Sequence, residues 1–486
     1  MSLNALTLKE AHEGLKTKQF SAGELLTGCL EQAKKINPQL NAYITIAEEP
    51  ARAAVHSADK LISSGEDISY LTGIPVAIKD ALCTKGIRST GAAKILDNYI
   101  PPYDATVIKR IRESGGVIIG KNNCDAFGHG ASNENSQYGP VKNPWNLTKV
   151  PGGSSGGSAA ALAADSCIYA IGEDTGGSIR QPASFCGVVG LKVSYGRNSR
   201  YGVMPMASSL DTVGPMSKTV WDAAAIMETI AGHDPLDSTT FDKPIPQYTR
   251  EIERDIKGLT VGLPREYFAE GLDDESRKII ATAIKQLEEL GVEIVEVSLP
   301  HTKYAIAVYY IVVPSEDSAN LSRLDGIRYG VRSSQAKDLF ETYTFSRRDG
   351  FPEEVKRRIM IGTFALSHGY YDAYYTQASK VRTLIKQDFT GVFAKVDALL
   401  TPVSPFPPFD LGAKVDDPLA MYLADIYMVP VSLAGVCGLS VPCGFTADHL
   451  PVGMQLVGPA LGEDVVLRLG HQYQQVTDWH TRKPSL

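Results

Sequence analysis

Two short glycine clusters carry serines that core packing does not require, and these serines are the first residues that could do covalent chemistry. Residues 151–158 read PGGSSGGS and residues 174–178 read DTGGS. Glycine opens backbone conformations that are closed to residues with a Cβ, so each cluster can form a tight turn. A flexible linker is the alternative interpretation of the first cluster. It is the weaker one, because a helix-favouring run at 158–164 and an apolar, strand-like run at 168–171 follow directly.

The second cluster leaves the end of this predicted strand, so its backbone N–H groups could converge on one point. The donors would be the N–H groups of Thr175, Gly176 and Gly177. Such a set of donors forms an oxyanion hole, which stabilises the charge that develops on a carbonyl oxygen. Ser178 ends the run of donors and is therefore the candidate nucleophile.

A serine hydroxyl is a weak nucleophile until a base takes its proton. No histidine lies between His129 and His233, and the nine histidines form no cluster with acidic partners. A lysine is the alternative base, and Lys79 ends an apolar run at 73–79 that predicts a buried strand. Burial favours the neutral amine of a lysine, which can accept a proton. Taken alone, Lys79 would be interpreted as a solvated lysine at a strand end rather than as a catalytic base. The two serine loops favour the catalytic interpretation.

Lys79, the GGSSGG loop and the segment DTGGSIRQPA at 174–183 together resemble the amidase signature family. The resemblance implies a Ser-cis-Ser-Lys triad in which Ser178 attacks an amide carbonyl. It implies that Ser154, on a cis peptide bond, relays protons between Ser178 and Lys79. It also implies that the N–H groups of residues 175–178 hold the oxyanion.

Segments of the C-terminal half resemble the glutaminase subunits of bacterial tRNA-dependent amidotransferases, a group within that family. The resemblance implies that Arg358 binds the α-carboxylate of glutamine, that Asp425 binds its α-ammonium and that Tyr309 adds hydrogen bonds. The chemistry agrees, since an arginine fork binds a carboxylate in a bidentate manner and an aspartate pairs with an ammonium. Considered singly, Arg358 fits a solvated helix face and Asp425 a surface charge. The matching segments are residues 309–310, 356–362 and 421–427.

The reaction implied by this resemblance is hydrolysis of the side-chain amide of glutamine. Ammonia would pass to a partner subunit that uses ATP and Mg²⁺ to activate glutamyl-tRNA(Gln) or aspartyl-tRNA(Asn), in a heterotrimer with subunits B and C. A net charge of −7 without a basic stripe predicts that tRNA is contacted mainly through the partner. The chain itself is expected to bind no cofactor and no metal. A near match to a phosphate-binding loop at 115–121 is rejected, because Asn122 replaces the required Ser or Thr.

Two alternatives remain open. A stand-alone amidase acting on another small or aryl amide would share the triad, and the pocket segment at 124–133 departs from the pattern common in the glutaminase subunits. His129 in that segment is interpreted as a pocket-lining or structural imidazole. A catalytically inactive scaffold of a complex is the second alternative, and retention of Lys79, Ser154 and Ser178 argues against it.

Alternating strand and helix patterns predict an α/β fold, in which helices cover both faces of a twisted sheet. The family resemblance adds that the sheet is mixed. We expect one domain over residues 1–486, with N-terminal helices at about 6–70 packing on the core. Capping boxes at Thr7 and Ser21 begin the first two helices, and Asn37 with Pro38 is expected to end the second.

The composition is that of an ordinary globular protein, with 43% hydrophobic and 21% charged residues. Seven cysteines without a C-x-x-C pair indicate reduced thiols rather than a disulfide framework or a zinc site. Neither a signal peptide nor a membrane-spanning run is expected. These features together predict a cytoplasmic protein.

Overall fold

The computed structural model describes residues 2–65, 67–269 and 271–486, and a mixed sheet of eleven strands runs through its centre. The strands are β1 (Tyr43–Ile46), β2 (Pro75–Lys79), β3 (Val117–Asn122), β4 (Tyr169–Asp174), β5 (Val189–Lys192), β6 (Thr212–Ser217), β7 (Thr260–Pro264), β8 (Glu293–Val297), β9 (Ala398–Pro402), β10 (Cys437–Phe445) and β11 (Pro451–Gly458). Their order across the sheet is β1-β3-β2-β4-β6-β5-β10-β11-β9-β7-β8.

The pairing of the strands confirms the expected mixed sheet. Strand β2 is parallel to both β3 and β4, and β7 is parallel to β8 and β9. The other neighbours, including β4 with β6 and β10 with β11, are antiparallel. The inner strands β2 to β6 are buried along their whole length, whereas the edge strands β1 and β8 are partly exposed. Strands buried on both faces read as continuous apolar runs, which is the pattern that the sequence shows around Lys79 and Ile171.

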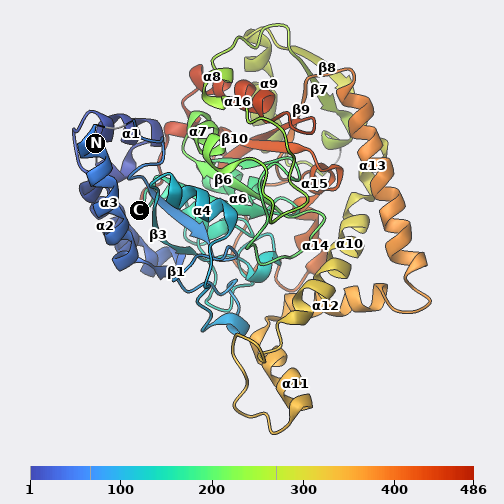
Figure 1. Ribbon diagram of the computed structural model, residues 1–486. Helices are drawn as coiled ribbons and strands as arrows, with labels where there is room; N and C mark the ends of the chain where they lie inside the picture. The colour runs from blue at the N-terminus through green and yellow to red at the C-terminus, as the bar shows by residue number, and fades with distance from the viewer. Residues whose placement is uncertain (1, 66, 270) are drawn as a thin grey trace.

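Helices surround this sheet (Figure 1). They are α1 (Leu8–Lys16), α2 (Ala22–Leu40), α3 (Glu48–Ser64), α4 (Thr106–Glu113), α5 (Gly156–Ala163), α6 (Arg180–Cys186), α7 (Val220–Ile230), α8 (Tyr248–Glu251), α9 (Asp274–Glu289), α10 (Ala305–Asn320), α11 (Leu339–Gly350), α12 (Glu353–Ala365), α13 (Gln377–Phe393), α14 (Pro418–Tyr422), α15 (Val429–Ala434) and α16 (Glu463–Gln475).

Both faces of the sheet carry helices, as expected. A Cβ on Gly470 of α16 would meet Val441 of β10. On the other face, a Cβ on Gly453 of β11 would meet Ser440 of β10 and Ser184 of α6. Successive side chains of a strand point to opposite faces, so α16 and α6 cover opposite sides of β10. Helices α10, α12 and α13 form a further layer beside the sheet, and α11 projects from the body of the molecule (Figure 1).

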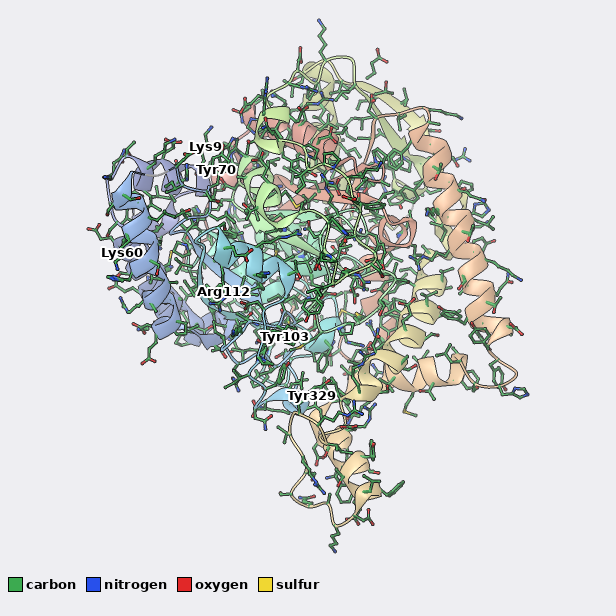
Figure 2. The ribbon with its side chains drawn as sticks, viewed as in Figure 1. Lys9, Lys60, Tyr70, Tyr103, Arg112 and Tyr329 are labelled. Carbon is green, nitrogen blue, oxygen red and sulfur yellow. The ribbon has the colours of Figure 1, made fainter. Side chains whose placement is uncertain are left out.

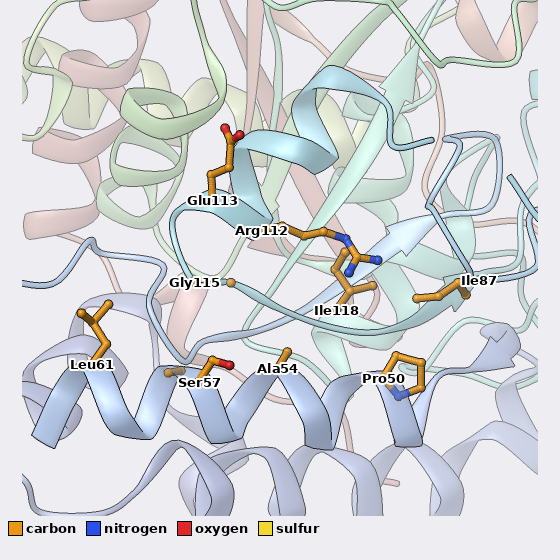
Figure 3. A pocket seen from close by; sticks show the side chains of 11 residues that line it. Pro50, Ala54, Ser57, Leu61, Ile87, Arg112, Glu113, Gly115 and Ile118 are labelled. Atoms are coloured by element: carbon orange, nitrogen blue, oxygen red, sulfur yellow. The ribbon is translucent and has the colours of Figure 1, made fainter. Parts of the chain in front are cut away.

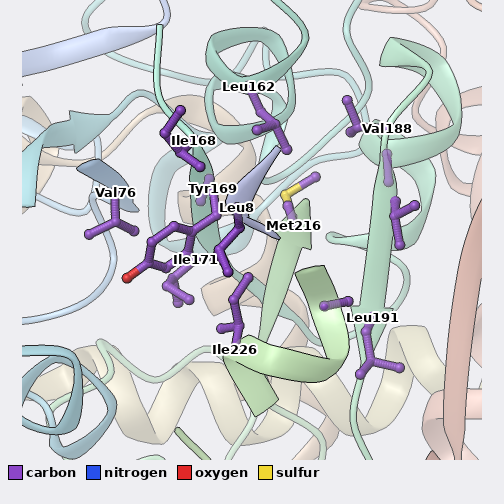
Figure 4. Packing of buried hydrophobic residues seen from close by; sticks show 14 of the residues in the cluster. Leu8, Val76, Leu162, Ile168, Tyr169, Ile171, Val188, Leu191, Met216 and Ile226 are labelled. Atoms are coloured by element: carbon purple, nitrogen blue, oxygen red, sulfur yellow. The ribbon is translucent and has the colours of Figure 1, made fainter. Parts of the chain in front are cut away.

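The main hydrophobic core lies around the central strands (Figure 4). Val76 of β2, Ile171 of β4 and Met216 of β6 pack there, and all are fully buried. Leu8 of α1 belongs to the same cluster, which anchors the N-terminal helices on the sheet.

Aromatic contacts fasten the N-terminal segment to α7 as well. The Lys9 ammonium lies 5.1 Å from the centroid of the Trp221 ring, and the ring of Tyr70 meets that of Trp221 edge-on at 5.2 Å. Lys9 and Tyr70 are seen side by side in Figure 2. The residues at each end of the N-terminal segment thus contact one helix of the core.

Within this N-terminal segment, the predicted starts of the helices are confirmed and one predicted end is wrong. Thr7 and Ser21 each form a capping box, with Glu10 and Glu24 respectively. Helix α2, however, continues through Pro38 to Leu40. Pro38 removes a hydrogen bond only in the last turn, and burial of Leu40 in that turn offsets the loss. The segment also contains a strand that was not predicted, β1, which pairs antiparallel with β3.

Most of the residues that resembled a phosphate-binding loop lie within β3, which covers Val117–Asn122, and the first glycines of the match form the turn before it. Lys121 is fully buried, and its ammonium donates to Thr84 Oγ1 at 3.0 Å and to Ser89 Oγ at 2.7 Å. This lysine therefore fastens a neighbouring loop. None of the helices of residues 2–65, 67–269 and 271–486 is long and apolar enough to cross a membrane.

Candidate active site

The two glycine clusters lie at the carboxyl ends of two parallel strands. Lys79 is the last residue of β2, and β4, its parallel neighbour, ends at Asp174. The first cluster runs into α5, which begins at Gly156, and the second runs into α6, which begins at Arg180. Adjacent parallel strands place their carboxyl ends at one edge, so this topology brings the predicted base and both serine loops together.

Lys79 and Ser154 are in direct contact. Lys79 Nζ and Ser154 Oγ lie 2.6 Å apart, and both residues are fully buried. The peptide bond between Gly153 and Ser154 is cis, as the family resemblance implied. The Gly153 N–H donates to Gln181 Oε1 at 3.0 Å, which ties the first loop to α6.

Ser178, the predicted nucleophile, lies beside this pair in the second loop. The backbone N–H of Ser155 donates to the carbonyl of Ser178 at 3.0 Å, so the two loops are adjacent. Ser178 is 7% exposed, whereas Ser154 is 0% exposed, so Ser178 is the serine that a substrate can reach. Within the described part of the chain, no hydrogen bond joins the two serine hydroxyls. Catalytic hydrogen bonds are often long in an enzyme without substrate and tighten when it binds.

Asp174 organises the backbone of the second loop. Its carboxylate accepts from the N–H of Gly177 at 2.8 Å and of Ile179 at 3.1 Å. Of the three predicted oxyanion donors, Gly177 is thus already engaged. The N–H groups of Thr175, Gly176 and Ser178 have no acceptor among the residues that the structure describes, so they remain available for an oxyanion.

Arg180 holds Asp174 in place. Its Nε lies 3.0 Å from Asp174 Oδ2 and its Nη2 lies 2.9 Å from Asp174 Oδ1, with both side chains fully buried. Burial alone would raise the pKa of Asp174, but the charge and hydrogen bonds of Arg180 outweigh it and lower that pKa. Arg180 also donates to Gln455 Oε1 at 2.6 Å and to Ser432 Oγ at 3.0 Å, which links the loop to β11 and α15. Sequence reasoning gave Asp174 and Arg180 no role, although both lie inside the motif.

Sequence reasoning also missed Glu173, the residue before Asp174. Its carboxylate Oε2 lies 2.7 Å from Lys79 Nζ, in an ion pair whose side chains are 2% and 0% exposed. The signal was present, because Glu173 and Asp174 are two acidic residues at the end of a strand whose preceding residues are uncharged and buried. Acidic residues are almost never fully buried unless they are paired.

The residues predicted to bind glutamine gather around the second loop. A Cβ on Gly176 would lie 2.5 Å from the Tyr309 hydroxyl, so this tyrosine of α10 lies against the oxyanion loop. A Cβ on Gly177 would meet Met428, which follows Asp425 by one turn. Asp425 is 7% exposed; burial raises its pKa well above the usual range, and the nearby Arg358 charge opposes that rise.

Arg358 of α12 is held in a rigid frame. Its Nε donates to Glu354 Oε1 at 2.8 Å, and its guanidinium stacks on the rings of Tyr310 and Tyr422 at 5.1 and 5.4 Å. The Tyr422 hydroxyl donates to the same Glu354 oxygen at 2.9 Å. Arg358 is 3% exposed, which excludes the solvated helix face considered from the sequence. Asp425 is equally not a surface charge.

The segment at 124–133 lies beside Arg358. A cavity of about 40 Å³ is lined by Gly130 and Ser132 of that segment and by Arg358. His129 is fully buried, with Nδ1 3.0 Å from the carbonyl of Ala126 and Nε2 3.0 Å from Asp317 Oδ2. These contacts fit the structural imidazole that the sequence favoured.

A larger cavity, of about 300 Å³, lies away from these residues (Figure 3). It is enclosed by α3 and by the turn at Gly115 that precedes β3. The parallel register of β2 and β3 pairs Pro75 with Val117 and Lys79 with Asn122, so this cavity and the Lys79 contacts lie at opposite strand ends. Across the described residues, no cluster of His, Cys, Asp and Glu has an arrangement that could hold a metal ion.

Comparison with known proteins agrees with the fold and the motifs. The profile of the family described as "Amidase" matches residues 24–467. The chain is 52% identical over 487 residues to the A subunit of the glutamyl-tRNA(Gln) amidotransferase of Desulfatibacillum aliphaticivorans, with 100% of each chain covered. It is 53% identical over 486 residues to the protein of the same name from Geotalea daltonii, again with 100% of each covered. The crystal structure of the protein of that name from Thermotoga maritima superposes with a TM-score of 0.79 and 39% identity, covering 98% of this chain and 96% of that chain.

Proposed function

The chain belongs to the amidase family, and on that premise we propose that it is the glutamine-hydrolysing subunit of a glutamyl-tRNA(Gln) amidotransferase. The observation that carries the proposal is that the residues predicted for the two ends of a glutamine site lie around one loop. The Lys79–Ser154 pair lies at one end, and Arg358 and Asp425 lie at the other. The α-carboxylate and α-ammonium of free glutamine require a cation and an anion. Arg358 is the cation, and the ammonium of a bound substrate would favour the charged form of Asp425.

In the proposed reaction, Ser178 Oγ attacks the side-chain carbonyl carbon of glutamine. The proton of Ser178 passes to Ser154, whose own proton passes to the amine of Lys79, 2.6 Å away. The N–H groups of Thr175, Gly176 and Ser178 hold the oxyanion in a site from which water is largely excluded. The C–N bond then breaks, the proton returns to the departing nitrogen as ammonia forms, and water cleaves the acyl-enzyme to glutamate.

At the end of the substrate away from the reacting amide, Arg358 binds the α-carboxylate and Asp425 binds the α-ammonium. Glu354 and the two tyrosine rings fix the guanidinium before substrate arrives, so little side-chain entropy is lost on binding. Tyr309 lies against the oxyanion loop and near the charges of Arg358 and Asp425, where its hydroxyl would add a hydrogen bond to the substrate.

Relatives whose names make them one subunit of an amidotransferase support a role within a larger complex. We propose that the ammonia passes to a partner subunit, that subunits B and C complete a cytoplasmic heterotrimer, and that the partner uses ATP and Mg²⁺. Contacts with tRNA would then be made mainly by the partner, in agreement with the net charge of −7.

The test is ammonia release from glutamine by the purified chain, alone and with candidate partner subunits, ATP and glutamyl-tRNA. Ser178→Ala is expected to lower kcat by about 10³-fold or more. Arg358→Ala is expected to raise KM by about 10- to 100-fold, because a charged hydrogen bond to the carboxylate is lost. Lys356→Ala is the matched control: this cation lies on the same helix, pairs with Glu353 and should leave KM unchanged. Rapid hydrolysis of aryl amides with glutamine ignored would contradict the proposal and favour a stand-alone amidase.

A further inference from the structure

An acidic residue, Glu173, contacts Lys79 in the candidate active site. Lys79 Nζ contacts three acceptors: Ser154 Oγ at 2.6 Å, Glu173 Oε2 at 2.7 Å and the Glu173 carbonyl at 3.2 Å. An ammonium has three N–H donors, so all three are used. A neutral amine keeps two donors, which the two Glu173 oxygens can accept, and turns its lone pair to Ser154. Glu173 therefore orients Lys79 toward Ser154 in both protonation states.

The other carboxylate oxygen of Glu173 belongs to a second contact. Thr175 Oγ1 lies 2.7 Å from Glu173 Oε1 and 2.7 Å from Asp211 Oδ1. A hydroxyl carries one proton, so it donates to one carboxyl group and accepts from the other, which must be protonated. Burial and the nearby Glu173 charge raise the pKa of Asp211 well above its usual range. Asp211 is thus the protonated partner, and Glu173 is the one that carries the charge.

We propose that Glu173 is a positioning residue of the relay, whose carboxylate aims Lys79 at Ser154 and sets the pH below which the relay stops. Removing this buried negative charge, which lies 2.7 Å from the lysine nitrogen, should let the relay work at lower pH, because a carboxylate at this distance favours a positively charged partner. Thr175 and Asp211 keep the Glu173 carboxylate in place. This inference rests on the proposed roles of Lys79 and Ser154.

Other ionisable groups around the pair come from the loop that follows β3. Cys124 and Asp125 both interact electrostatically with Lys79. Burial raises the pKa of Asp125 to about 7 and keeps the Cys124 thiol protonated by raising its pKa. Asp211, from the loop before β6, is a further titratable group on which the Glu173 charge acts. Glu173 is the carboxylate among them that touches the ammonium.

The experiment measures the rate at which a fluorophosphonate reagent modifies Ser178 in the full chain, across about pH 5 to 10. In this reaction the Ser178 oxygen bonds to phosphorus, fluoride leaves and the proton enters the relay, so no glutamine is needed. Glu173→Gln keeps the size of the side chain and removes its charge. We expect the acid limb of the rate profile to move to lower pH by at least about one unit. The pH profile of glutamine hydrolysis should move in the same direction.

Two further variants make the result decisive. Asp211→Asn alters the other carboxyl group bonded to Thr175, and the limb should stay in place because Asp211 already carries no charge. Glu173→Ser leaves room for a water beside Nζ and should move the limb as Gln does, even if the Gln variant folds poorly. An acid limb that stays in place in both Glu173 variants, whatever happens to the plateau rate, would overturn the inference. A shifted limb for Ser178 modification without any glutamine hydrolysis would leave the inference intact and refute the proposed substrate.

Discussion

The Arg180 guanidinium supports the shape of the oxyanion loop by holding the Asp174 carboxylate in place. Its planar fork meets both oxygens of Asp174, and Asp174 in turn holds the N–H groups of Gly177 and Ile179. A lysine would keep the positive charge but could not make two parallel hydrogen bonds to one carboxylate. The loop geometry therefore requires an arginine at this position.

Arg180→Lys is accordingly expected to lower kcat by about 100-fold or more while KM for glutamine changes little. The physical reason is that the N–H donors lose their alignment with the oxyanion, and one misplaced donor lowers kcat by about 10²- to 10³-fold. Steady-state kinetics of ammonia release measure both constants.

Arg197→Lys provides the matched comparison for that measurement. Arg197 is another buried arginine, 3% exposed, and it donates to the Tyr248 hydroxyl from Nε at 2.9 Å and from Nη2 at 2.7 Å. This variant should lower the melting temperature and leave kcat unchanged. If Arg180→Lys also lowers only the melting temperature and leaves kcat unchanged, Arg180 does not shape the oxyanion loop.

The secondary-structure elements explain which site residues could be predicted from the sequence. Lys79 and Ser178 could be singled out from local patterns, because each combines a reactive group with a strand end or a glycine-rich turn, whereas the role of Ser154 came from the family resemblance. The contact of Lys79 with Glu173 was not, since it depends on the register of β2 against β4, in which Ile78 is paired with Ile171. Hydrophobic patterns give the strands but not their pairing, and the contacts of Thr175 with Glu173 and Asp211 escaped prediction for the same reason.

The ends of the helices and strands also show that features set by local sequence were predictable, whereas features set by long-range contacts were not. The capping boxes of α1 and α2 are local, and both were predicted correctly. The end of α2 depends on burial of its last turn, in which Leu40 is fully buried, and a rule based on Pro38 alone gave the wrong residue. Strand β1 is only four residues long and is recognisable only through its pairing with β3.

Two glycines in helices should respond to alanine in opposite ways. A Cβ on Gly157 of α5 would lie 2.2 Å from the carbonyl oxygen of Asn123, a backbone atom that cannot move aside cheaply. A Cβ on Gly391 of α13 would meet nothing within 4 Å. We expect Gly157→Ala to lower the free energy of unfolding by about 1–3 kcal/mol. Gly391→Ala should raise it by about 0.5–1 kcal/mol, because alanine has the higher helix propensity.

Urea denaturation of both variants measures these changes. The close approach of α5 to the loop after β3 also sets the position of Ser154, so Gly157→Ala should reduce glutamine hydrolysis as well. Equal stability of the two variants would mean that α5 can shift away from Asn123. The packing that positions the first serine loop would then be looser than the structure indicates.

At the scale of the whole molecule, contacts at one turn join segments from both ends of the chain. Asn4 Nδ2 donates to the Asp165 carbonyl at 3.0 Å, and Lys483 Nζ lies 2.7 Å from Asp165 Oδ1. Lys218 Nζ lies 2.6 Å from the same carboxylate oxygen. The two ends of the chain thus contact one turn just before β4, and Figure 1 marks both ends on the same side of the molecule. This closure is consistent with one domain over residues 1–486, which stays a prediction until unfolding is measured.

The seven cysteines offer that measurement, since all are buried and free. A thiol reagent requires an exposed thiolate, so it should modify none of them in the native protein at neutral pH. Under increasing denaturant, labelling of each cysteine reports the free energy of the opening that exposes it. Cys29 lies in α2 of the N-terminal segment, and Cys443 lies in β10. If the chain unfolds as one unit, mass spectrometry should find the same denaturant midpoint for both. Modification of Cys29 at clearly lower denaturant would show that the N-terminal helices open separately, and the single-domain prediction would then be wrong.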